Sequence, residues 1–95
     1  MSLIFEWDTR KAATNARKHG IEFSEAIVVF DDPLAKIFPD TWHSESESRE
    51  IIIGHLRDRR LCLVVFTEIG EDRLRIISAR VATPKEQRDY ERNAG

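Results

Sequence analysis

The chain has a single cysteine, Cys62, and no hydrophobic run long enough to cross a membrane. One thiol excludes an internal disulfide and any zinc site built from several cysteines. Cys62 lies in the apolar run 61–66, which predicts a buried small side chain rather than a reactive thiol. The first seven residues hold neither the basic nor the apolar segment of a signal peptide. We therefore expect a cytoplasmic protein with no membrane partner.

A strong excess of charge of one sign is also missing, since the net charge is -2. This value argues against a strongly basic protein that coats nucleic acid. The average hides a gradient, however. Residues 1–48 hold 5 Lys/Arg against 9 Asp/Glu, a net of -4, whereas residues 49–95 hold 10 against 8, a net of +2. Nine of those ten cations are arginines, whose planar fork suits phosphate, so the second half is where an RNA backbone could bind.

Length and pattern predict one α+β domain over residues 1–95. Turn and capping residues divide the chain into a short strand, two helices, four strands and a last helix. The expected elements are strand 3–7, helix 9–18, helix 24–30, strand 34–38, strands 49–56, 61–69 and 73–81, and helix 84–92. Short connections between the last strands favour antiparallel hairpins. We expect a mostly antiparallel sheet with the helices on one face.

The first helix carries the first group of candidate residues. Lys11, Asn15 and Lys18 recur at helical spacing and form a stripe that could hold phosphate, or simply a solvated face. His19 follows at the helix end, just before Gly20. Histidine side chains as a class can transfer protons near neutral pH, but an imidazolium at a helix end also interacts favourably with the helix dipole without any catalytic duty.

The last strand carries the second group. Arg75 and Arg80 point to opposite faces if the strand is regular, and a bulge near Ser78 would change that. Each arginine needs a partner, either a phosphate or a carboxylate such as Glu68 or Glu86.

Three further candidates have plain structural alternatives. Arg49 could bind phosphate or pair with Glu45 and Glu47, and Tyr90 could act on a substrate or pack on the sheet with its hydroxyl in water. The loop that holds Asp40, His43, Glu45 and Glu47 lacks a recognised metal-ligand spacing. We therefore expect no metal site and no cofactor.

The ordered combination of these motifs resembles the BrnT toxin family across nearly the whole chain. The matching residues are Phe5-Glu6-Trp7-Asp8, Lys11-Ala12, Asn15, Lys18-His19-Gly20, Phe23, Ala26, Phe30-Asp31-Asp32-Pro33, Glu47, Arg49, Gly54, Arg75-Ile76-Ile77-Ser78-Ala79-Arg80, Ala82, Glu86 and Tyr90. The resemblance implies a RelE-like fold, a ribonuclease that stops translation, and a BrnA-type antitoxin that neutralises it and binds operator DNA. The acidic net charge departs from the basic character common among such toxins.

On this resemblance we expect metal-independent cleavage of RNA by attack of the 2′-hydroxyl on the adjacent phosphate. His19 is the leading acid/base candidate. The expected roles of the others are stabilisation of the phosphorane by Arg75 and Arg80, binding of RNA phosphate by Lys11, Lys18 and Arg49, and stacking or hydrogen bonding by Tyr90. The alternative is a non-catalytic module that uses the arginine-rich strand only to bind RNA or protein.

Overall fold

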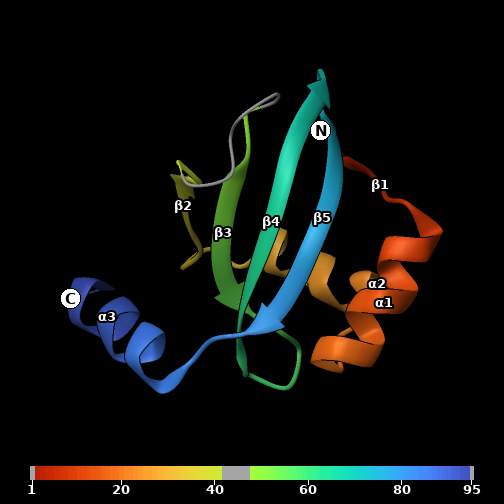
Figure 1. Ribbon diagram of the computed structural model, residues 1–95. Helices are drawn as coiled ribbons and strands as arrows, with labels where there is room; N and C mark the ends of the chain where they lie inside the picture. Colours follow the sequence, from red (N-terminus) through yellow and green to blue (C-terminus); the bar gives the residue numbers. More distant parts are fainter. Residues whose placement is uncertain (1, 42–47, 95) are drawn as a thin grey trace.

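The computed structural model describes residues 2–41 and 48–94, and Figure 1 shows their arrangement. The elements are β1 (Ile4–Glu6), α1 (Thr9–His19), α2 (Phe23–Ala26), the 3₁₀ helix η1 (Ile27–Asp31), β2 (Lys36–Pro39), β3 (Glu50–His55), β4 (Leu61–Gly70), β5 (Arg73–Val81) and α3 (Pro84–Ala94). None of the helices in this part of the chain is long and apolar enough to cross a bilayer.

A five-stranded sheet in the order β1-β5-β4-β3-β2 forms the centre of the molecule. Strands β2 to β5 are consecutive antiparallel neighbours, which confirms the predicted hairpins. β1 pairs parallel with β5 at one edge, and its Glu6 lies opposite Arg75. The sheet is therefore mostly antiparallel, as predicted, and its first strand brings a carboxylate beside an arginine of the last.

Helix α1 has the boundaries that its capping residues predict. The Asp8 carboxylate accepts hydrogen bonds from the backbone N–H groups of Arg10 and Lys11 at 2.8 and 3.1 Å. At the other end Gly20 adopts the left-handed conformation, with φ 71°, and its N–H donates to the carbonyl of Ala16. These caps fix which residues occupy the last turn of α1, where His19 lies.

The second helix is shorter than predicted, because its α-helical part ends at Ala26 and continues as the 3₁₀ helix η1. The run Ile27-Val28-Val29 is β-branched, and such side chains are restricted in the α-helix. Asp32 then forms a turn through its carboxylate and carbonyl, which accept from the N–H groups of Leu34 and Ala35. This turn delays β2 to Lys36, two residues later than expected.

The two faces of the sheet are covered differently. Helices α1, α2 and η1 cover one face and enclose the main core, in which Phe23, Ile52 and Val64 are buried. The opposite face carries a smaller cluster, in which Tyr90 of α3 packs with Ile53 and its neighbours on β4. The prediction that all helices cover one face is therefore wrong for α3. Consecutive residues of β3 are apolar, so apolar side chains lie on both faces of this strand. The second face must therefore also be shielded from water near β3.

Candidate functional site

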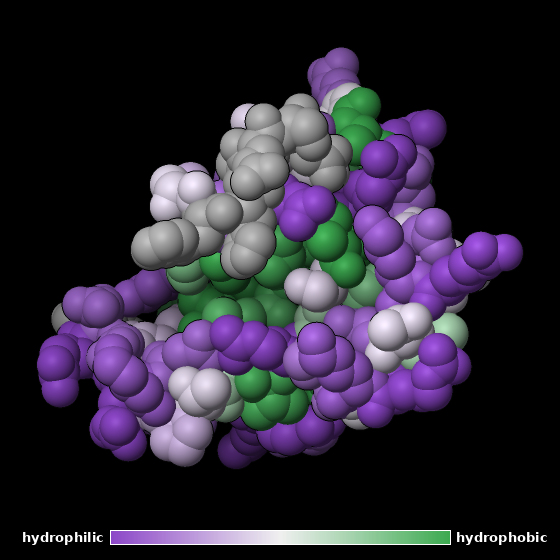
Figure 2. All heavy atoms as spheres, in the orientation of Figure 1, coloured by the Kyte–Doolittle hydropathy of each residue, from purple (hydrophilic) through white to green (hydrophobic). Residues whose placement is uncertain are grey.

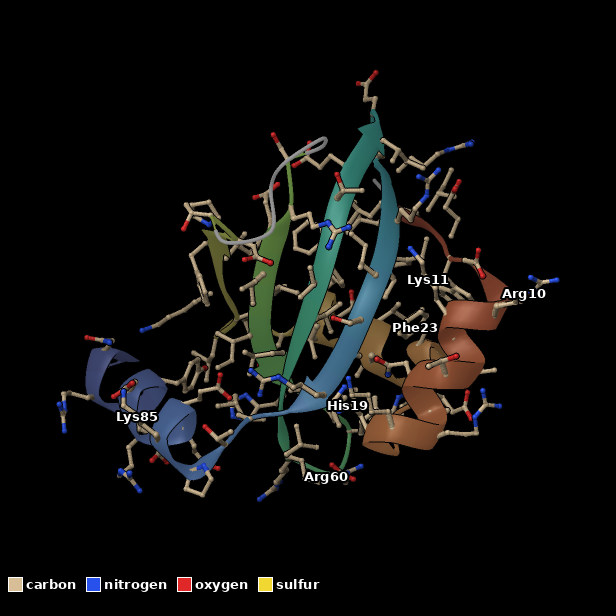
Figure 3. The ribbon with its side chains drawn as sticks, in the orientation of Figure 1. Arg10, Lys11, His19, Phe23, Arg60 and Lys85 are labelled. Carbon is tan, nitrogen blue, oxygen red and sulfur yellow. The ribbon has the colours of Figure 1, made fainter. Side chains whose placement is uncertain are left out.

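Helix α1 and strand β5 border a shallow groove of about 300 Å³. Its lining includes Lys11, Lys18 and His19, so the structure brings together three of the predicted site residues. In Figure 3, Lys11 and His19 extend from α1 on the side that faces β5. Two ammonium groups and an imidazole along one groove can hold a phosphate beside a group that transfers protons.

Asn15 lies between these residues, but its amide serves the fold. The side chain is buried, its Nδ2 donates to the carbonyls of Ile21 and Ala79 at 3.0 and 2.9 Å, and its Oδ1 accepts from the N–H of Ala79 at 3.0 Å. Asn15 thus pairs with Ala79 as a neighbouring strand would. It joins α1 to β5 and is occupied by backbone groups rather than held ready for phosphate.

A β-bulge in β5 decides which face its arginines occupy. Ser78 lies opposite Val65 and Ile76 opposite Phe66, so Ile77 is an extra residue in β5. In a regular strand Arg75 and Arg80 would point to opposite faces. The bulge places both on the face opposite α1, where they pair in register with Thr67 and Leu63 of β4. The dependence on a bulge near Ser78, noted from the sequence, is confirmed.

A second groove, of about 500 Å³, lies on the face that carries Arg80. Its lining residues are Asp40, Arg49, Ile51, Leu63, Val65, Ile77, Ser78 and Arg80. The two grooves share Ile77 and Ser78 in their linings and therefore adjoin at the bulge. We call the surface formed by Lys11, Lys18, His19, Arg49 and Arg80 the cationic surface. Figure 2 shows an apolar patch over the sheet, with hydrophilic side chains below it and to its right.

Arg80 has an internal partner, as one of the sequence alternatives anticipated. Its two Nη atoms each lie 2.7 Å from one carboxylate oxygen of Glu86. The hydrogen bonds from Arg80 lower the pKa of Glu86 to about 2 despite the opposing effect of burial. The same pair raises the pKa of Arg80 above its usual value. Glu86 is thus a fixed anion that orients Arg80 and a poor proton acceptor near neutral pH.

Arg75 lies apart from both grooves, near the β1 edge of the sheet. Its partner is Glu6 of β1, at 3.2 Å, rather than the Glu68 considered from the sequence. Both side chains are nearly half exposed, and such surface pairs contribute little to stability. Arg75 therefore shares a face with Arg80, and a phosphate could replace its carboxylate partner at small cost.

Tyr90 lies on α3, on the far side of Arg80 from α1. Its hydroxyl donates to the carbonyl of Leu34 at 2.7 Å, so it is not left to water as the packing alternative assumed. Burial and, to a smaller extent, the charge of Asp32 raise the pKa of Tyr90. It lines a separate groove of about 300 Å³ with Lys36 and Phe38, and the structure does not bring it next to His19.

His55 has a structural environment that differs from that of His19. Its Nδ1 and its backbone N–H both lie 2.7 Å from Oδ2 of Asp32, and its ring packs edge-on against Tyr90. Burial opposes ionisation of Asp32, but hydrogen bonds from Leu34 and His55 lower its pKa overall. His55 thus ties β3 to the turn before β2. His43, the remaining histidine, lies outside the described residues.

No group of three or more His, Cys, Asp or Glu side chains in residues 2–41 and 48–94 could hold a metal ion. Of the four loop residues weighed as ligands, Asp40 is described and buried, whereas His43, Glu45 and Glu47 lie outside the described residues. Cys62 is fully buried, and burial raises its pKa to about 11, which confirms the expected inert thiol.

Ser78 is one of the residues at this surface that the sequence analysis did not assign; Arg10 and Thr14 in the α1 groove are others. Ser78 is half-buried and lines both grooves where they meet. Strand alternation alone places it on the same face as Leu74 and Ile76, in the core. Its position between Arg75 and Arg80 in a strand is the signal that could have identified it as a site residue. A serine buried among apolar residues needs a hydrogen-bond partner, so a place outside the core is favoured for it.

The geometry can now be compared with known proteins. Residues 7–86 match the family described as ribonuclease toxin, BrnT, of type II toxin-antitoxin system. The fold is similar to that of the crystallised ribonuclease toxin BrnT from Brucella abortus, with a TM-score of 0.66 and 30% sequence identity over 87% of this chain and 97% of that chain. No curated protein matches the chain. The chain belongs to the BrnT family of ribonuclease toxins of type II toxin-antitoxin systems.

Proposed function

We propose that this chain acts in the cytoplasm as a single-domain endoribonuclease that inhibits translation by cleaving RNA without a metal ion. The observation that carries the proposal is that the two grooves adjoin at the β5 bulge, where Ile77 and Ser78 line both of them. The shared lining supports a single RNA-binding surface that includes both His19 and Arg80. A proton-transfer group and a fixed guanidinium within reach of one bound strand are what phosphodiester cleavage requires.

In the proposed reaction the RNA 2′-oxygen attacks the adjacent phosphorus and the bond to the 5′-oxygen breaks. A base takes the 2′ proton and an acid supplies a proton to the leaving oxygen, so the products are a cyclic phosphate and a 5′-hydroxyl. His19 performs one of these transfers. DNA survives because it lacks the nucleophile.

The cationic side chains have different proposed roles, which follow from their positions. Lys11, Lys18 and Arg49 bind the RNA backbone, and Arg80, oriented by Glu86, stabilises the charge of the phosphorane. Because Arg75 lies outside both grooves, it binds a neighbouring phosphate of the RNA from the β1 side, after exchanging Glu6 for that phosphate, rather than the phosphorane itself. Tyr90 stacks on RNA that continues past Arg80 towards α3, or donates to it after exchanging the Leu34 carbonyl for an RNA acceptor. Leu63 favours this path, because it lines both the Arg80 groove and the Tyr90 groove.

Purified protein is the material for the first test. We expect cleavage of single-stranded RNA to a cyclic phosphate product in excess EDTA, and no cleavage of the same sequence as DNA. Loss of activity on chelation that a divalent ion restores would contradict metal independence. Induction in cells without a partner should stop growth and deplete RNA. Normal growth at verified soluble expression would count against a toxin.

The partner in this proposal is a BrnA-like antitoxin, through which alone the complex contacts operator DNA. We expect it to cover the sheet face around Arg75 and Arg80 and so block RNA, because acidic or amphipathic segments complement that face. Cross-linking of the complex, followed by mapping of the linked residues, tests this footprint. A partner bound far from both arginines, with RNA still able to bind, would contradict it.

The alternative is a non-catalytic module that binds RNA or protein through the same face. The carboxylate partners of both arginines favour this alternative, because they give each arginine a role without catalysis. A binder loses affinity when the arginines are replaced and is indifferent to His19, whereas an enzyme loses turnover and keeps binding when His19 is replaced.

A further inference from the structure

The bulge in β5 changes the direction of a serine as well as that of an arginine. Leu74 and Ile76 are buried in the main core, and regular alternation would carry Ser78 and Arg80 onto the same face. The extra residue, Ile77, reverses the alternation, so Ser78 lies opposite Val65 and reaches the open face. Bulges are common next to active sites because they redirect single side chains.

Asn15 fixes the backbone immediately after this bulge. Its buried amide satisfies both the N–H and the carbonyl of Ala79, which follows Ser78 directly. The same amide also donates to Ile21, beyond the end of α1. The position of Ser78 relative to α1 is therefore set by short hydrogen bonds from the helix that carries Lys11 and His19.

The Ser78 hydroxyl has no part in this fixed framework. No hydrogen bond joins it to another residue in the described part of the chain, although it lines the groove with Lys18 and His19 on one side and the groove with Arg80 on the other. A half-buried hydroxyl held between cations suits an anion better than it suits the fold, because it can donate to a phosphate oxygen.

We infer that Ser78 is a further substrate-binding residue, whose hydroxyl donates a hydrogen bond to a non-bridging oxygen of the phosphate held between His19 and Arg80. This inference rests on the proposed ribonuclease function. Ser78 keeps its own proton, and the 2′-oxygen of RNA remains the nucleophile. The hydrogen bond strengthens as negative charge develops on the phosphate, so its effect belongs mainly to the rate of cleavage.

Single-turnover cleavage of a short RNA by Ser78→Ala and Ser78→Thr tests the inference. We expect Ser78→Ala to cleave about 10- to 100-fold more slowly with little change in KM or Tm, since the fold does not use the hydroxyl. Ser78→Thr, which keeps the hydroxyl on a side chain suited to a strand, should regain most of the rate. Ser24→Ala, which removes an exposed hydroxyl from α2, should match the wild type.

The series separates the two proposals. Wild-type cleavage that Ser78→Ala leaves unchanged would overturn the assignment of Ser78 while the ribonuclease function stands. Slow cleavage by both Ser78 variants alike would also overturn it, because the hydroxyl would then not be the group that matters. A wild-type protein that cleaves no RNA, with Arg80→Ala indistinguishable from it, would overturn the proposed function itself.

Discussion

The Arg80 side chain has a structural partner, Glu86, and in the proposed function it also binds the RNA phosphate. Its pair with Glu86 has two hydrogen bonds of 2.7 Å, and both groups are about one third exposed. Glu86 is also the N3 residue of the capping box of α3. Its carboxylate accepts from the backbone N–H of Thr83, and its own backbone N–H donates to the Thr83 hydroxyl. One carboxylate therefore sets both the start of α3 and the direction of the guanidinium.

This arrangement predicts an acid-dependent loss of stability that belongs to Glu86. The folded pKa of about 2 lies below the ordinary 4.5, so the pair stabilises the fold fully above about pH 4.5 and is lost as pH falls towards 2. Glu86→Gln keeps the cap acceptor and should lower the free energy of unfolding at pH 7 by roughly 2 kcal/mol, a value discounted for solvent exposure.

Urea unfolding from pH 7 to pH 2 measures this contribution. The wild type and Glu86→Gln should differ at pH 7 and converge near pH 2, because protonated glutamate and glutamine are then both neutral. Asp32 titrates in both proteins and cancels in the comparison. Two curves that stay parallel over the whole range would show that the ion pair does not stabilise the fold.

At the scale of elements, Gly54 of β3 permits η1 to lie directly against the sheet. A Cβ at this position would lie 3.1 Å from both the carbonyl oxygen and the Cβ of Val29 and 3.2 Å from the Cβ of Ala35. Two of these atoms belong to side chains, but the carbonyl is backbone, so η1 as a whole must shift. We expect Gly54→Ala to destabilise the protein by about 1–3 kcal/mol in thermal or urea unfolding.

Gly70 is the matched control, because it is a β4 glycine with an ordinary backbone conformation. A Cβ there would meet only the Cβ of Arg73 at 3.8 Å, which is normal contact. Gly70→Ala should change stability by less than about 0.5 kcal/mol. Equal effects of the two substitutions would mean that the close approach of η1 is not what Gly54 allows.

The two ends of α1 and the start of α3 were predictable from the sequence because their determinants are local. Asp8, Gly20 and the Thr83 to Glu86 box act within a few residues of the backbone that they cap. A bulge near Ser78 could be raised from the sequence as an alternative but could not be established, since the same residues alternate equally well with or without it. Its register depends on Val65 and on Asn15, which lies 64 residues from Ala79 in the chain.

The sequence also did not predict the placement of α3 or the parallel pairing of β1, because both depend on contacts between residues far apart in the chain. Tyr90 can pack on either face as far as the sequence shows, and its hydroxyl bonds to Leu34, 56 residues away. Of the candidate site, the sequence identified the residues and the structure adds their neighbours. Lys11, Lys18 and His19 come together, Arg49 and Arg80 join them across the bulge, and Arg75 and Tyr90 lie to either side.

For the whole molecule, the distribution of charge matters more than its sum. A net charge of -2 does not concentrate RNA near the protein, but in the proposed function the RNA phosphate binds locally at the cationic surface. Low general affinity combined with a local site is compatible with an enzyme that docks on a larger RNA assembly. The same localisation allows one antitoxin segment to close the site.

The central claim is that His19 transfers a proton at this surface, and the direct measurement compares RNA cleavage by His19→Ala and His55→Ala. His55 is a suitable control because it binds Asp32 and lines neither the α1 groove nor the Arg80 groove. We predict that His19→Ala, folded and still binding RNA, loses about 10²- to 10⁴-fold in rate, whereas His55→Ala retains cleavage at a temperature where it is folded. Full activity of His19→Ala would contradict the account and reduce His19 to a helix-terminal residue.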